Sequence, residues 1–212
     1  MTSQAPQQPI RLHRLALSGH CHRVELFLSL LRLPYTCIDV DLPAGEQKRP
    51  AFLALNPFGQ VPVIQDGDVT VADSNAILVY LDGRYAPGQW LPRDPLGGAR
   101  VQRWLSVAAG PLAYGAAAAR VITLFGRPDN PAAAIARAHQ LLALMEQQLA
   151  AQPWLAGPEP TLADLANYAY TAHAPEGGVS LEAYPAVRGW LQRVEAMPHF
   201  VPMPASPVGL CA

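Results

Sequence analysis

A proline at position 62, set between two valines in an apolar segment, constrains the fold of this chain more than any other residue. Proline has no N–H group to give to a sheet ladder, so it is normally excluded from a central strand. Residues 61–64 nevertheless have the pattern of a strand, followed by a hairpin turn at Asp66-Gly67 and a returning strand over residues 69–71. Pro62 therefore marks either an edge strand or a place where the backbone serves something other than the sheet.

Apolar patterns on both sides of this hairpin predict a βαβαββα order for the first part of the chain. Residues 36–42 alternate between apolar and polar side chains, as a half-buried strand does. An apolar face at helical spacing runs from Val24 to Leu31 and ends before Pro34. The predicted elements are, in order, a strand over residues 10–17, a helix that contains residues 23–31, a strand over residues 36–42, a short helix over residues 52–55, the hairpin, and a helix around residues 76–81 that Asp73-Ser74 can cap.

This order of elements is that of a thioredoxin-like lobe, and it gives Pro62 a function. In such a lobe the bond between Val61 and Pro62 is expected to be cis, which turns the N–H and C=O groups of Val61 outward to pair with an extended peptide. Glutathione is a peptide of this kind. On this segment alone, an ordinary proline on an edge strand remains the competing interpretation.

A cluster of proline and glycine between Pro87 and Gly98 predicts a linker between two domains. Beyond it no segment has a convincing strand pattern. Residues 101–125, 132–150, 162–172 and 186–197 carry helix formers at helical spacing, with proline-rich breaks between them. The predicted fold class is therefore α/β plus all-α, with a thioredoxin-like domain over residues 10–87 and a helix bundle over residues 95–203.

Composition limits the kinds of partner that the chain can have. Its 15 basic and 16 acidic residues give a formal charge of −1, which is no electrostatic signature for nucleic acid or an anionic membrane surface. A length of 212 residues, half of them hydrophobic, allows two small cores. We therefore expect a small-molecule partner rather than a nucleic acid or a membrane.

The cysteines and the start of the chain indicate a cytoplasmic setting. Cys21, Cys37 and Cys211 form an odd set without metal-like spacing, so we expect neither a disulfide framework nor a bound metal. Residues 1–9 lack the basic start and apolar run of a signal peptide. We also find no run of about 18 apolar residues, and so expect no transmembrane helix.

The longest ordered set of motifs surrounds Pro62. It comprises EQKRPAFLALNPFGQVP at residues 46–62, Asp66-Gly67-Asp68, ADSNAI at residues 72–77 and, in the second half, Gly157, Thr161, Ala163 and Asp164. These motifs resemble the cytosolic glutathione transferase superfamily, and in particular its plant phi class, over nearly all of residues 10–200. The resemblance implies a glutathione-binding lobe, a helical lobe for the second substrate, and a homodimer.

The resemblance also implies how glutathione is held. Val61, which precedes the structural Pro62, would bind the cysteinyl part through its main chain, with help from the side-chain amide of Gln60. Asp73 would attract the γ-glutamyl ammonium group, although the family more often has glutamate there, and Ser74 would bind the carboxylate at a helix N-terminus. The alternative is that this pair is only a helix cap.

Gln47 and Lys48 occupy the place of a His-Lys pair that clamps the glycine carboxylate of glutathione in phi-type enzymes. Lys48 keeps the charge, whereas Gln47 departs from the pattern. A solvated lysine in a loop is the alternative interpretation.

By the same resemblance, activation of the glutathione thiol belongs to Ser18. The thiol is mostly protonated at pH 7, and the thiolate is the nucleophile. ALSGHCHRV at residues 16–24 resembles the serine-type active-site segment, and the Ser18 hydroxyl would donate to sulfur where the first strand gives way to a helix. Chemistry of the tyrosine type is excluded because the first tyrosine is Tyr35. An ordinary helix N-cap is the alternative for Ser18.

Cys21 offers a competing chemistry. Ser18 and Cys21 have the spacing of a redox CxxC motif in which serine replaces the first cysteine, and beta-class transferases use a cysteine at this helix start. A buried, inert thiol is the alternative. His20 and His22 flank Cys21, and we expect both to be surface residues.

In the second half, the resemblance gives Trp104, Tyr114 and Arg120 as candidates for the second-substrate pocket, with ordinary packing as the alternative for each. Thr161 and Asp164 have the spacing of a capping box, which we assign to folding.

These residues favour conjugation of glutathione to small hydrophobic electrophiles as the function. Two alternatives remain: a glutathione-dependent disulfide reductase or peroxidase, and a non-catalytic protein that keeps the scaffold.

Overall fold

A computed structural model describes residues 5–206, and these divide into two compact units. The first unit extends to Leu91 and also includes Pro198–Met203, whereas the second comprises Pro92–Met197 and residues 204–206. Cys211 lies outside the described residues.

The first unit is built on a four-stranded mixed sheet of order β2-β1-β3-β4. In this sheet β1 pairs parallel with β2 and antiparallel with β3, which in turn pairs antiparallel with β4. The predicted βαβαββα order is confirmed. The elements are β1 (Ile10–Arg14), α1 (Gly19–Leu30), β2 (Tyr35–Asp39), η1 (Glu46–Lys48), α2 (Pro50–Leu53), β3 (Val63–Asp66), β4 (Val69–Ala72) and α3 (Ser74–Tyr85).

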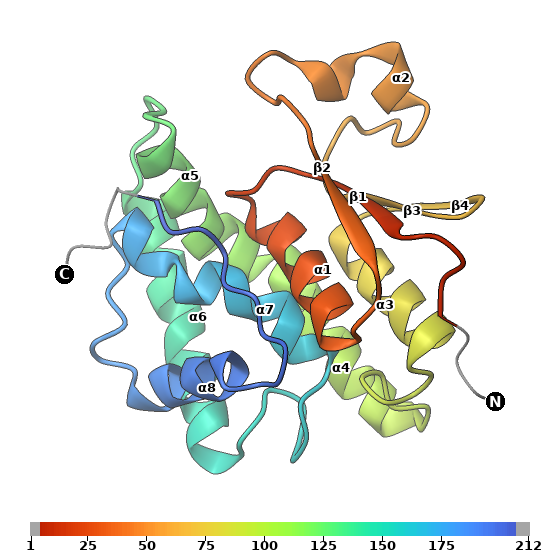
Figure 1. Ribbon diagram of the computed structural model, residues 1–212. Helices are drawn as coiled ribbons and strands as arrows, with labels where there is room; N and C mark the ends of the chain where they lie inside the picture. Colours follow the sequence, from red (N-terminus) through yellow and green to blue (C-terminus); the bar gives the residue numbers. More distant parts are fainter. Residues whose placement is uncertain (1–4, 207–212) are drawn as a thin grey trace. The chain divides into compact units, whose positions relative to one another are not determined.

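Different helices cover the two faces of this sheet (Figure 1). Helices α1 and α3 contact each other on one face, and the η1–α2 segment lies on the other. Successive side chains of a strand point to opposite faces, so the neighbours Val63 and Ile64 of β3 enter different cores. Val63 packs with Phe52 of α2 and Val40, whereas Ile64 faces α1 and α3. Both faces of β3 are therefore buried.

Three strands of the first unit have other bounds than the sequence predicts: β1 and β2 end early, at Arg14 and Asp39, and β3 is shifted toward the turn. Strand β3 begins at Val63, so the prediction of a strand from residue 61 is wrong and Pro62 precedes the strand. Because proline has no N–H group, its place just outside the ladder removes no sheet hydrogen bond. Strand β1 ends at Arg14 because the chain turns there, with the Ser18 N–H group donating to the Leu15 carbonyl.

The segment Pro198–Met203 belongs to the first unit although it comes late in the chain. The His22 ring donates through Nε2 to the Val201 carbonyl at 2.8 Å, and the Ser29 hydroxyl donates to the His199 carbonyl at 2.7 Å. Met203 is buried. This segment is therefore fastened along α1.

The second unit is a helix bundle, as predicted. Its contacts join α4 to α7, α6 to α8, and α5 to η3. Its elements are α4 (Pro95–Ala109), the π-helical turn η2 (Ala113–Ala117), α5 (Ala118–Leu124), α6 (Ala132–Ala151), α7 (Leu162–Ala172), η3 (Ala174–Gly177) and α8 (Pro185–Glu195).

The first long helix of this unit differs from its prediction at both ends. Pro95, which we expected in the linker, is the first residue of α4, and the Asp94 carboxylate caps the helix by accepting the Gly97 N–H. The predicted helix over residues 101–125 is broken at Gly110 and again at Gly115, whose φ and ψ are −101° and −105°. A Cβ atom at Gly115 would lie 3.0 Å from the Ala138 nitrogen of α6, so close helix packing accounts for this break.

The run of helical segments Pro95–Leu124 is long and apolar enough, by length and composition alone, to cross a membrane. The expectation of no transmembrane helix is not tested by this result and stays a prediction. Several side chains of this run, among them Val101, Leu105 and Ala108, are nevertheless buried inside the protein. Core helices of soluble proteins pass the same test.

Candidate active site

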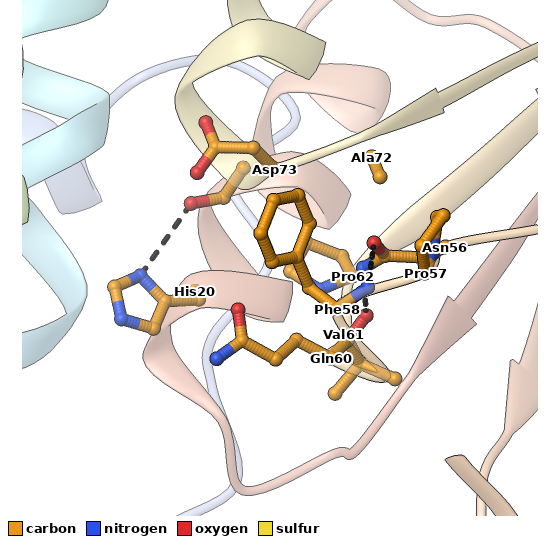
Figure 2. A pocket seen from close by; sticks show the side chains of 10 residues that line it. His20, Asn56, Pro57, Phe58, Gln60, Val61, Pro62, Ala72 and Asp73 are labelled. Carbon is orange, nitrogen blue, oxygen red and sulfur yellow. Dashed lines mark hydrogen bonds between the residues drawn. The ribbon is translucent and has the colours of Figure 1, made fainter. Parts of the chain in front are cut away.

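A cavity of about 460 Å³ opens in the first unit where the start of α1, the loop before β3 and the β4–α3 junction meet (Figure 2). Ligand pockets have volumes of this order. Five of the predicted site residues line it, namely Gln60, Val61, Pro62, Asp73 and Ser74. The three other predicted site residues of the first unit, Ser18, Gln47 and Lys48, are not among its lining residues.

Val61 lies on the wall of this cavity with its main chain outside the sheet. The Val61–Pro62 bond is cis, as predicted. The ladders that join β3 to β1 and to β4 begin at Val63, so in the described part of the chain Val61 takes part in neither. A main chain in this position can pair with an extended peptide in the manner of an added strand.

Asn56 holds the loop that carries Val61, and sequence reasoning missed it. Its side-chain Nδ2 donates to the Gln60 carbonyl at 2.8 Å, and its Oδ1 accepts the Phe58 N–H at 3.1 Å. The Asn56 side chain is buried. In the sequence, Asn56-Pro57 indicated only the end of a short helix, and nothing local showed that the amide ties a binding loop.

Asp73 and Ser74 begin α3 at the opposite wall of the cavity. The Asp73 Oδ1 accepts the N–H groups of Asn75 and Ala76, both at 2.9 Å, so the cap that the sequence predicts is present. Asp73 also has a φ of 73°, a left-handed conformation that non-glycine residues rarely adopt and that tends to occur at functional sites. Its exposed carboxylate and the helix N-terminus together make this wall suited to a zwitterionic end group.

Ser74 is buried and hydrogen-bonded on two sides. Its Oγ lies 3.2 Å from Nη1 of Arg23 and 3.4 Å from Nδ1 of His20. Arg23 also donates to the Asn75 side-chain oxygen at 2.9 Å. These contacts join the start of α1 to the start of α3.

Ser18 is the N-cap of α1. Its Oγ accepts the Cys21 N–H at 3.4 Å, which leaves the hydroxyl hydrogen to be donated elsewhere. The Cys21 side chain is 1% exposed, and its sulfur accepts the Leu15 N–H at 3.4 Å. Burial raises the pKa of the Cys21 thiol to about 11. A thiol in that state is a poor nucleophile at neutral pH, which counts against Cys21 as a redox centre.

The two histidines of this segment are not surface residues, so that prediction is wrong. His22 is buried against the chain segment around Val201. His20 is half-buried and lines the cavity, and burial together with the nearby charge of Arg23 lowers its pKa to about 3. His20 is therefore neutral at physiological pH.

Gln47 and Lys48 lie in η1, next to the loop that lines the cavity. The Lys48 ammonium group is exposed and donates to the Phe58 carbonyl at 3.2 Å. Gln47 is half-buried, and its Oε1 accepts no hydrogen bond from any residue that the structure describes. Both residues are thus close to the cavity loop without forming its wall.

Gly59 allows η1 and the cavity loop to approach each other. Its φ is 58°, and a Cβ atom there would lie 2.8 Å from the Gln47 main-chain oxygen. We expect Gly59→Ala to lower the free energy of unfolding by about 3 kcal/mol, because backbone strain and a clash with main chain add together. Gly67→Ala is the matched control: its φ is 57° with nothing within 4 Å, so it should cost only about 1 kcal/mol. If urea unfolding showed equal losses of stability in the two variants, the close approach of Gly59 to the Gln47 main chain would be contradicted.

The predicted residues of the second unit differ in their burial and in their partners. The capping box of α7 is confirmed. The Asp164 carboxylate accepts the Thr161 N–H group, and the Thr161 hydroxyl accepts an N–H group of the first helical turn. Trp104 is buried and Tyr114 is 65% exposed. Arg120 is buried and paired with Glu176 at 2.5 Å, which commits its charge to the interior of this unit.

Comparisons with known proteins agree with this arrangement. The family models "Glutathione S-transferase, N-terminal domain" and "Glutathione S-transferase, C-terminal domain" match residues 17–84 and 117–198. Glutathione S-transferase 3 of Zea mays is 35% identical, over 94% of this chain and 97% of the relative.

Solved structures agree as well. A glutathione S-transferase from Pseudomonas fluorescens superposes with a TM-score of 0.86 at 36% identity, covering 92% of this chain and 99% of the other. A glutathione transferase homologue from Drosophila mojavensis, solved with bound glutathione, has a TM-score of 0.82 at 28% identity, covering 90% of this chain and 89% of the other. A thioredoxin-like unit with a peptide-sized cavity, followed by a helix bundle, defines the class. The chain belongs to the cytosolic glutathione transferase superfamily.

Proposed function

We propose that this protein conjugates glutathione to small hydrophobic electrophiles, and that residues 10–87 form the glutathione-binding domain. Residues 95–203 form the second-substrate domain, apart from the segment Pro198–Met203, which belongs to the first compact unit. The observation that carries this proposal is the cavity in which Val61 and the Asp73-Ser74 pair lie on facing walls. In a glutathione transferase, these walls are suited to the cysteinyl and the γ-glutamyl parts of one tripeptide.

Glutathione would bind through contacts at both ends and in the middle. The cysteinyl main chain pairs with Val61 beside the Gln60 amide, and the γ-glutamyl carboxylate meets the main-chain N–H group of Ser74 at the N-terminus of α3. Asp73 attracts the ammonium group of that end. Lys48, which already reaches the cavity loop through the Phe58 carbonyl, attracts the glycine carboxylate, with Gln47 beside it.

In the chemical step, the Ser18 hydroxyl donates to the glutathione sulfur at the start of α1 and stabilises the thiolate. The thiol proton passes to solvent. The thiolate then attacks the electrophilic carbon, a C–S bond forms, and the leaving group departs with its electron pair. With an aryl halide the products are a thioether and a halide ion.

Ser18→Ala tests this assignment. We expect kcat/KM for conjugation of an aryl halide to fall about 100-fold, because one hydrogen bond to the developing thiolate is lost. The ultraviolet absorbance of bound thiolate should fall with it at neutral pH. Ser18→Asp is the matched variant, since an ionised aspartate keeps the helix cap but has no hydrogen to donate, and it should lose activity without losing stability. Unchanged conjugation and unchanged thiolate absorbance in both variants would remove Ser18 from the mechanism.

The same assay separates the competing functions. Activity that survives Ser18→Ala but disappears in Cys21→Ala would favour a disulfide reductase or peroxidase. No heat of glutathione binding at millimolar concentration would favour a non-catalytic protein.

The biological setting belongs to the proposal too. We infer a homodimer in the cytoplasm that removes reactive electrophiles, in keeping with the family and with the reduced state expected for its cysteines. Sedimentation of the purified protein tests the dimer.

A further inference from the structure

Arg23 occupies an unusual position for a charged side chain. It lies on α1 and is 1% exposed. Burying a guanidinium group costs several kcal/mol unless its charge and its N–H groups are satisfied. Two of its hydrogen bonds go to side chains at the start of α3, at 3.2 Å to Ser74 and 2.9 Å to Asn75. This buried cation therefore acts on the wall of the glutathione cavity.

The direction of the hydrogen bonds follows from the groups involved. A guanidinium group only donates, so the Ser74 oxygen accepts from Arg23. The Ser74 hydroxyl can then donate its hydrogen to Nδ1 of His20, which lies 3.4 Å from the Ser74 oxygen (Figure 2). His20 is neutral, since burial and the Arg23 charge hold its pKa near 3. Its Nδ1 can accept, and the ring proton is then carried by Nε2.

This series of bonds ends at His20, near the start of α1, where the proposed function places the glutathione sulfur. His20 is the second residue of α1, two positions after Ser18, and lines the same cavity as Val61. In Figure 2 the ring turns one nitrogen toward the Ser74 hydroxyl, and its other nitrogen lies on the far side of the ring from that bond. Because Nδ1 faces Ser74 at the γ-glutamyl wall, the Nε2–H group points away from that end of the peptide.

We propose that His20 is a second hydrogen-bond donor to the glutathione thiolate, and that Arg23 is a positioning residue which fixes this donor through Ser74. The inference rests on the proposed function, since it needs glutathione in the cavity. It explains why a charged arginine, and not an apolar side chain, occupies this buried position. Ser18 and His20, two positions apart at the start of α1, would then both donate hydrogen bonds to the sulfur.

The test measures the pKa of the bound glutathione thiol by ultraviolet titration of the thiolate. We expect His20→Leu to raise that pKa by about one unit, which is about tenfold less thiolate below the pKa, because a hydrogen bond to a charged group is lost. His20→Asn keeps an N–H donor of shorter reach and should recover part of the effect. Arg23→Gln should shift the thiol pKa in the same direction, and Arg23→Lys less.

Non-additivity distinguishes positioning from a general loss of stability. If Arg23 acts through His20, Arg23→Gln adds little to the thiol pKa once His20→Leu is present. Nitrogen-15 NMR of the His20 ring gives a readout without glutathione: the wild type should show a proton on Nε2, and Arg23→Gln a mixture of tautomers. Additive shifts, or the same tautomer in both proteins, would overturn the role of Arg23.

The two levels of the argument fail in different ways. A wild-type protein that binds no glutathione in calorimetry would overturn both the proposed function and this inference. Glutathione binding with an unchanged thiol pKa in His20→Leu would overturn this inference alone. A rise in KM at an unchanged thiol pKa would do the same, since it would place the His20 donor on a carboxylate of glutathione.

Discussion

Asp164→Ala is expected to lower the free energy of unfolding by about 5 kcal/mol, because its carboxylate satisfies several donors in the interior of the second unit. One oxygen accepts the Leu155 N–H at 3.0 Å and the Trp190 indole N–H at 2.9 Å. The other accepts the Thr161 N–H at 2.9 Å. Asp164 is 0% exposed, so water cannot replace these bonds. Each N–H group left without a partner costs about 1–3 kcal/mol.

Two further variants make this prediction specific. Asp164→Asn keeps one acceptor oxygen but turns an amide N–H toward a donor of Thr161, and we expect it to lose about half as much. Glu159→Ala removes an exposed carboxylate from the preceding loop and should change stability by less than about 0.5 kcal/mol. Urea unfolding followed by circular dichroism measures all three. An Asp164→Ala variant as stable as Glu159→Ala would show that the capping box contributes little.

Glu176→Gln is expected to cost about 3 kcal/mol, because it removes the negative charge that pairs with a buried guanidinium group. Glu176 is 0% exposed and Arg120 is 1% exposed, with 2.5 Å between Oε2 and Nε. Its other oxygen lies 2.6 Å from Nδ1 of His173 and accepts the Ser206 N–H at 3.2 Å. The double variant Arg120→Met with Glu176→Leu removes both charges and should be more stable than Glu176→Gln. A double variant that is less stable than the single one would contradict this account.

The same carboxylate predicts an acid dependence of stability. Burial alone would raise the pKa of Glu176, but hydrogen bonds from His173, the Ser206 N–H and Arg120 outweigh it, and the pKa is lowered. A lowered folded-state pKa stabilises the fold above the unfolded pKa of glutamate, about 4.3, and this contribution is lost as the pH falls through the folded value. The free energy of unfolding should therefore fall more steeply with acidification in the wild type than in Glu176→Gln. Parallel curves below about pH 5 would contradict it.

Most of the features that the sequence predicted correctly have local causes. The cap at Asp73 and the capping box at Thr161 follow from residue types at fixed short spacing, whereas the cis bond before Pro62 was expected from the thioredoxin-like order of elements. The order of strands and helices follows from the period of apolar residues, which also depends only on neighbours. Contacts within a few residues can be read without knowledge of the fold.

The features that the sequence missed depend on distant partners. Gly115 breaks a helix because α6 approaches it at Ala138, which no local pattern indicates. The sequence analysis made no prediction for the Arg23 side chain, whose partners lie 51 and 52 residues further along the chain. The importance of His20 comes from the same long-range contact. For this reason the polar wall of the cavity could not be derived from the motif around Ser18 alone.

The late segment fastened along α1 has a consequence for how the protein is made. Residues Pro198–Met203 are needed to complete the first unit, and they leave the ribosome only after the entire helical unit between Pro92 and Met197 has been synthesised. The nascent thioredoxin-like lobe therefore lacks the carbonyl partners of His22 and Ser29 throughout translation of its neighbour. Maturation of the lobe that holds the cavity is in this way postponed to the end of synthesis, and no single cut in the gene separates the two lobes intact.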